Sequence, residues 1–108
     1  MSSTTILMAT ETLDHFIGQL DAVYWEASVM EHKDVVFNIS RVLTEELIEL
    51  HKVSIQDGHY KYEPVSENLR TIIPQLAWLN DHLTQITRRT DTQADVQPVL
   101  RRVQQLIS

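Results

Sequence analysis

Apolar residues recur at alternating steps of four and three along much of this chain, and this period constrains the fold more than any other feature. In the first part of the chain the series consists of Leu13, Ile17, Leu20, Tyr24 and Ala27. At about 100° per residue these positions share one side of a helix, as in helices that pack on near-parallel neighbours. The 108 residues include only two glycines and three prolines, which favours long helices over a turn-rich β protein. We therefore expect an all-α fold.

The period breaks near residue 31, and this break predicts a turn between two helices. A second apolar series then starts, formed by Val35, Val36, Ile39, Val42, Leu43, Leu47, Leu50 and Val53. The simplest explanation is a tight turn at residues 31–34, with Asp34 as the cap of the second helix. Because no glycine or proline marks this turn, one long helix over residues 11–54 is the alternative.

Two later series predict a third helix from about residue 64 to 86 and a fourth over 95–107. The third series stays in phase across Pro74, so we expect a continuous helix that is kinked there. Pro98 is placed in the first turn of the fourth helix, after a short link over residues 90–95. The predicted fold is an antiparallel up-down bundle of four helices, the last one short. It forms a single domain, 1–108, in which residues 1–10 are a flexible N-terminal arm.

Composition and charge exclude several functional classes. The net charge of −6 argues against binding to nucleic acid, which needs cations against phosphate. No apolar run is long enough to cross a bilayer, and the first residues do not resemble a secretory signal, so we expect no membrane partner. With no cysteine there is no disulfide framework, and we expect a cytoplasmic protein.

Several apolar residues lie off the predicted core stripes and suggest a second, partner-binding face. On the first helix, Gly18, Ala22, Trp25 and Val29 step 4, 3 and 4 on the side opposite the stripe, and Trp78 lies off the stripe of the third helix. A weaker second line on the second helix contains Phe37, Thr44, Ile48 and Ile55. Large exposed apolar patches mark contact sites, and tryptophan is a favoured interface anchor. We therefore expect a protein-binding module of the adaptor, inhibitor, immunity or chaperone type, acting as a homodimer. The alternative is that the fourth helix, the N-terminal arm or the loop over residues 54–63 folds over these residues.

The segment 57–64, DGHYKYEP, is the other candidate for recognition. Gly58 suits a left-handed turn that ends the second helix. An extended path would send the rings of Tyr60 and Tyr62 to the same side, next to His59. These three residues form either a recognition loop or a cap on the end of the bundle, and we favour the cap because buried rings cover apolar area.

The sequence carries no catalytic or cofactor motif. The spacing of its five histidines matches no metal-ligand set, and its two glycines form no phosphate loop, so we expect no enzyme activity, metal or cofactor. One arrangement differs. Glu31 with Asp34, and Glu46 with Glu49, each place two carboxylates on one helical face. These pairs resemble, in reversed order, the Mg²⁺-binding carboxylates of the all-α nucleotide pyrophosphohydrolases, and this resemblance implies a Mg²⁺-dependent hydrolase as the alternative function.

Glu46 is unusual because it lies inside the apolar stripe of the second helix. A carboxylate at this position must be paired, reach solvent at the edge of the stripe, or have a raised pKa, and we expect a partner among Arg70, Arg101 and Arg102.

Overall fold

The structure is a computed structural model that describes residues 4–53 and 55–108. These residues form four α-helices, α1 (Ile6–Glu26), α2 (Met30–His51), α3 (Ile73–Ile86) and α4 (Thr90–Ile107). Two short 3₁₀ helices, η1 (Ile55–Asp57) and η2 (Leu69–Ile72), lie between α2 and α3. The prediction of an all-α fold with four helices is confirmed.

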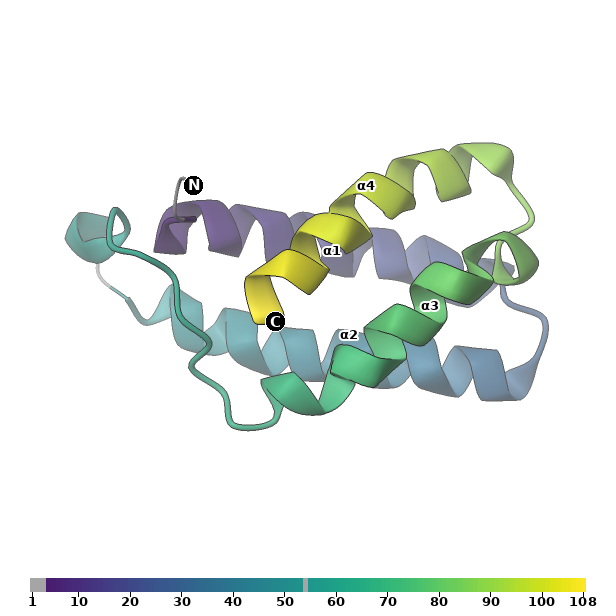
Figure 1. Cartoon of the computed structure of the whole chain (residues 1–108), viewed down its shortest axis with the longest axis horizontal. Helices are drawn as coiled ribbons and strands as arrows, with labels where there is room; N and C mark the ends of the chain where they lie inside the picture. The colour runs from purple at the N-terminus through teal and green to yellow at the C-terminus, as the bar shows by residue number, and fades with distance from the viewer. Residues whose placement is uncertain (1–3, 54) are drawn as a thin grey trace.

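The four helices pack compactly around one apolar core. Helix α1 contacts α2 and α4, while α3 packs on α4 and, together with η2, on α2. In Figure 1, α3 and α4 lie nearer the viewer than α1 and α2. All four helices bury apolar side chains, among them Phe16 and Leu20 of α1, Ile39 and Leu43 of α2, Leu76 and Leu79 of α3, and Leu100 and Val103 of α4. Among the described residues, both other helices lie on this one side of the α1–α2 pair (Figure 1).

The first two helices form the predicted hairpin, but the turn lies earlier than expected. Helix α1 ends at Glu26 and α2 begins at Met30, so the connection is residues 27–29 and not 31–34. Asp34 lies inside α2 and is not its cap; the cap position is Val29, which makes no side-chain cap bond. On the other side of the turn, Lys33 of α2 holds the end of α1, because its Nζ donates to the carbonyl of Tyr24 at 2.6 Å.

Helix α1 starts within the segment that we expected to be an N-terminal arm. It begins at Ile6, so the expected arm is helical from that residue onward, while residues 1–3 lie outside the described part of the chain. The first N–H groups of a helix have no acceptor within it. The loop after α2 supplies two acceptors: Ile6 N donates to the carbonyl of Tyr60 at 2.8 Å, and Leu7 N to that of Gly58 at 2.9 Å.

The third helix is shorter than expected, and the predicted kink at Pro74 is wrong. Residues 62–66 have no helical structure, and η2 leads directly into α3, in which Pro74 occupies the first turn. A proline is tolerated there because the first N–H groups need no partner within the helix. The apolar period continues through this 3₁₀ turn. The sequence pattern alone therefore does not distinguish a 3₁₀ turn followed by a helix from one kinked α-helix.

The fourth helix is long, and the prediction of a short last helix is wrong. It has 18 residues and starts at Thr90, so the expected link over 90–95 belongs to the helix, and Pro98 lies in its interior. Glu26 at the end of α1 makes this early start possible. Its carboxylate accepts hydrogen bonds from Arg88 N at 2.9 Å, from Arg89 N at 2.8 Å and from the hydroxyl of Thr92.

None of the helices in the described part of the chain has the length and apolar character needed to span a bilayer.

Candidate functional site

The feature that stands out on the surface is an aromatic groove between α1 and α2. Trp25 of α1 and Phe37 of α2 are 71% and 61% exposed, although both are large apolar side chains. They line one hollow of about 380 Å³, whose other lining residues are Ile17, Leu20, Asp21, Tyr24, Val36 and Ser40. We call the surface around this groove the outer face, defined by Trp25, Met30, Phe37 and Ile48.

Helix α2 extends the outer face along its length. Met30 is 66% exposed and Ile48 52% exposed, and both share the side of α2 that carries Phe37. Met30, Phe37, Thr44 and Ile48 are spaced by seven, seven and four residues, which keeps them on one side of the helix. The second line that the sequence showed on α2 is thus exposed at Phe37 and Ile48, while the side chain of Ile55 lies outside the described residues.

The indole of Trp25 is held in place by its neighbours. The rings of Tyr24 and Trp25 meet edge to face, with centroids 5.3 Å apart. The ammonium of Lys33 lies 4.4 Å from the centroid of the Tyr24 ring and 5.4 Å from that of Trp25. A cation over aromatic faces is attracted by their electron-rich centres. Lys33 also bonds to the carbonyl of Tyr24, so this one side chain of α2 contacts both rings and the end of α1.

The other members of the predicted partner-binding series, Gly18, Ala22 and Val29, are exposed but do not line the groove that Trp25 lines. Gly18 lies on the exposed side of α1, with no atom within 4 Å of where a Cβ would be. Ala22 lines a different groove, which α1 forms with α4. Val29 is 41% exposed but belongs to the turn after α1, not to its surface. The helix ends three residues before Val29, so the expected spacing does not continue to that position.

Trp78 is largely covered by the chain itself. It is partly buried against the core and lies between two histidines. The ring of His82 stacks on it at 4.7 Å, and the ring of His32 lies 5.3 Å away. His82 is also hydrogen bonded through Nδ1 to the carbonyl of Trp78 at 2.8 Å. These two rings come from α2 and from α3 itself, and not from the last helix, the N-terminal arm or the segment 54–63.

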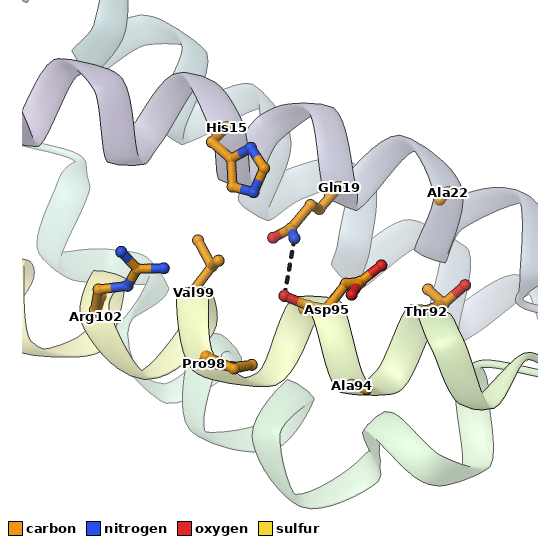
Figure 2. A pocket seen from close by; sticks show the side chains of 10 residues that line it. His15, Gln19, Ala22, Thr92, Ala94, Asp95, Pro98, Val99 and Arg102 are labelled. Carbon is orange, nitrogen blue, oxygen red and sulfur yellow. Dashed lines mark hydrogen bonds between the residues drawn. The ribbon is translucent and has the colours of Figure 1, made fainter.

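A second groove lies between α1 and α4 (Figure 2). It has a volume of about 530 Å³, and Gln19 crosses it to donate from Nε2 to the carbonyl of Asp95 at 2.9 Å. The Oε1 atom of Gln19 is buried without a hydrogen-bond partner. His15 and Arg102 face each other across one end, with Pro98 and Val99 between Arg102 and Asp95 on α4 (Figure 2). Polar and apolar side chains both line this groove, and none of its lining residues is Phe, Tyr or Trp.

The loop over 57–64 acts as a cap on the bundle, and its two tyrosines diverge. Tyr62 is buried, whereas Tyr60 is 57% exposed and stacks on His59 at 4.4 Å. The expectation that both rings point to the same side is wrong, because a turn that bonds Tyr60 N to the carbonyl of Asp57 precedes the extended part of the loop. Gly58 does not adopt the expected left-handed conformation, since no described glycine has a positive φ.

Glu46 anchors this loop and is completely buried. Its carboxylate accepts from the hydroxyl of Tyr62 at 2.5 Å, from Val65 N at 2.9 Å and from Ser66 N at 2.7 Å. Burial, this hydrogen bond and the charge of Glu46 all raise the pKa of the Tyr62 hydroxyl, which keeps it a donor.

The arginines that we expected beside Glu46 do not provide its partner. In the described part of the chain, neither Arg70, Arg101 nor Arg102 forms an ion pair with Glu46. Backbone N–H groups satisfy a buried carboxylate without the cost of desolvating a guanidinium. Sequence reasoning identified the buried acid but could not identify donors from an irregular loop.

The four carboxylates of the alternative metal site do not meet. Glu31 and Glu46 lie on the single helix α2, fifteen residues and roughly 22 Å apart at 1.5 Å per residue. Glu46 is used by the loop, and Glu49 pairs with Lys52 at 3.1 Å. The described residues contain no group of three or more His, Cys, Asp or Glu side chains placed to hold a metal ion.

Comparison of the chain with family models, with curated proteins and with solved structures found no match.

Proposed function

We propose that this chain is a non-catalytic protein-binding module that works as a homodimer through its outer face. The observation that supports this proposal most is the exposure of Trp25 and Phe37, two aromatic side chains from different helices that line one groove. A contiguous apolar surface of this kind typically marks an interaction site. Aromatic residues are enriched at the centres of interfaces, where they contribute much of the binding free energy.

The outer face has about the size that a stable dimer requires. Helices α1 and α2 have 21 and 22 residues, so each is about 30 Å long. Two packed helices are about 20 Å wide, which makes the face about 600 Å² in projection. Standard interfaces bury roughly 800 Å² of accessible surface on each partner, and accessible area exceeds projected area. A second copy could therefore cover the groove and its apolar surroundings together.

An adaptor, inhibitor, immunity or chaperone role in the cytoplasm fits such a module. The dimer would leave the α1–α4 groove, which lies on the other side of α1, free for contact with further molecules. The carboxylates of the alternative hydrolase lie apart on one helix, so we do not favour an enzyme.

Sedimentation equilibrium over a range of protein concentrations tests this proposal. We expect the wild-type chain to dimerise and Trp25→Ser to weaken the dimer by about 30-fold or more, since loss of a central aromatic anchor typically costs at least about 2 kcal/mol. The matched control is Tyr60→Ser, which removes an exposed ring outside the outer face and should leave the dimer unchanged. Circular dichroism verifies that both variants remain helical. A wild-type chain that stays monomeric at high micromolar concentration, or equal effects of the two variants, would contradict the proposal.

A further inference from the structure

The two helices of the outer face carry different charges near the groove, acids on α1 and two bases on α2. On α1, Asp14 and Asp21 are exposed and share the side of Trp25, because the three positions are spaced by seven and four residues. On α2, Lys33 and Arg41 lie four residues before and after Phe37, on the side of α2 that it occupies. Asp34, seven residues before Arg41, is an exposed acid on the same side of α2, so the charges that border the groove are acids on α1 and of both signs on α2.

Two copies can stack these faces with two-fold symmetry in two simple ways. If the two-fold axis runs parallel to the helices, α1 of each copy lies on α2 of the other. If the axis runs across the helices, α1 lies on α1 and α2 lies on α2. A two-fold interface uses the same patch on both copies, so every cross-contact occurs twice. The second arrangement would set the acidic side of α1 of one copy against the acidic side of α1 of the other, which costs free energy at an interface.

The order of residues along the helices is consistent with the first arrangement. Asp21 and Trp25 line the groove together with Phe37, so these residues lie at about the same height. Helices α1 and α2 run in opposite directions (Figure 1). Asp14, seven residues before Asp21 on α1, therefore lies toward the part of α2 that contains Arg41. An axis parallel to the helices keeps these heights. It brings Asp14 toward Arg41 of the second copy and Asp21 toward Lys33 of the second copy.

We infer that the partner on the outer face is a second copy of this chain, docked with α1 against α2 of the other copy. This inference rests on the proposed function and adds to it the orientation of the two copies and the charges that select it. Within its own helix, Arg41 pairs with Glu45 at 2.9 Å, but both side chains are about half exposed and such a pair contributes little. Arg41 can therefore turn to a partner without a large loss.

Charge reversal on opposite sides of the face tests the orientation. Asp14→Lys and Arg41→Glu are each expected to weaken the homodimer by about tenfold or more, because each places like charges together twice. An equimolar mixture of the two variants should form a heterodimer of nearly wild-type affinity, since Lys at position 14 then meets Glu at position 41. Native mass spectrometry resolves the heterodimer, and energy transfer between labelled copies measures its affinity. Glu67→Lys is the matched control, because it reverses an exposed charge away from the outer face.

The outcomes separate this inference from the proposed function. If Trp25→Ser dissociates the dimer but the mixed charge variants show no rescue, the face is correct and the orientation is wrong. If α1 instead lies on α1, Asp14→Lys will bind the wild-type chain more tightly than the wild-type chain binds itself, which also overturns the inference. If the wild-type chain does not dimerise at all, the proposed function itself fails.

Discussion

At the scale of single residues, Glu46 shows how a charged side chain can serve as a core residue. Its carboxylate lies among apolar side chains of α2, and its acceptors are used by a tyrosine hydroxyl and two backbone N–H groups. These bonds hold the irregular segment at residues 62–66 against the helix. The apolar stripe on α2 already indicated that this acid is buried, but the donors come from a loop without a periodic pattern.

Replacing Glu46 by glutamine should destabilise the protein. The amide offers one acceptor oxygen, and its NH₂ group would face the N–H of Val65 or Ser66, leaving a buried donor without a partner. We expect Glu46→Gln to lower the free energy of unfolding by about 1–3 kcal/mol. Urea denaturation at pH 7 measures this change, with Glu45→Gln as the exposed control, for which a loss under about 0.5 kcal/mol is expected. Equal stability of Glu46→Gln and the wild-type chain would contradict the hydrogen bonding described for this carboxylate.

At the scale of helices, two helix ends are held by side chains from neighbouring helices. Glu26 at the end of α1 accepts bonds at the start of α4, and Lys33 in the first turns of α2 donates to the end of α1. A carboxylate near the N-terminus of a helix and an ammonium near the C-terminus each interact favourably with the helix dipole. Neither contact follows a local capping motif, which explains why the start of α4 was placed too late from the sequence.

The Glu26 contact predicts a pH dependence of stability. Burial by itself raises the pKa of this carboxyl, but the bonds from Thr92, Arg89 and Arg88 and the charge of Arg89 together hold it below its ordinary value. A pKa that is lower in the folded state stabilises the protein above the unfolded-state value, about 4.3, and this contribution is lost as the pH falls through the folded-state pKa.

Glu26→Gln should therefore be less stable than the wild-type chain at pH 7, and this difference should shrink toward pH 3. Thermal unfolding at intervals between these pH values measures the effect. Glu67→Gln, with a carboxyl in an exposed turn, controls for the loss of one negative charge. A difference between Glu26→Gln and the wild-type chain that stays constant over this range would show that the charge of Glu26 does not stabilise the start of α4.

The two prolines in helices show that the sequence pattern does not locate the start of a helix. Pro74 begins α3, where its missing N–H has no consequence, whereas Pro98 removes the donor for the carbonyl of Ala94 inside α4. Near Pro98, Gln19 of α1 donates to the next carbonyl, that of Asp95, and joins the two helices. From sequence we assigned the two prolines the opposite positions, because apolar phase alone does not show where a helix begins.

At the scale of the whole molecule, the arrangement of the helices decides which apolar residues are covered. Helices α3 and α4 lie on one side of the α1–α2 pair (Figure 1), and His32 and His82 cover Trp78 on its other faces. No helix of the described part of the chain covers the outer face, and Trp25 and Phe37 are exposed. The proposed dimer would place a second α1–α2 pair on that side and bury both rings.

A dimer through the outer face predicts a melting temperature that depends on protein concentration. Association that favours the folded state stabilises it by mass action. We expect the melting temperature of the wild-type chain to rise by several degrees over a hundredfold increase in concentration, and that of Trp25→Ser to stay nearly constant. Scanning calorimetry measures both. A wild-type melting temperature that is independent of concentration would count against the dimer.

The sequence by itself determined the all-α class, the four helices and most of the core, because the apolar period is a local property that each helix carries along its own length. It also identified Trp25 as lying off the core and Glu46 as lying within it. Tertiary structure decided where α3 and α4 begin, which side chains cap the helices, and which second-face residues stay exposed. These outcomes depend on contacts between residues far apart in the chain, such as Glu26 with Thr92 or Glu46 with Ser66. A helical period carries no information about such distant partners, so the structure was needed to find them.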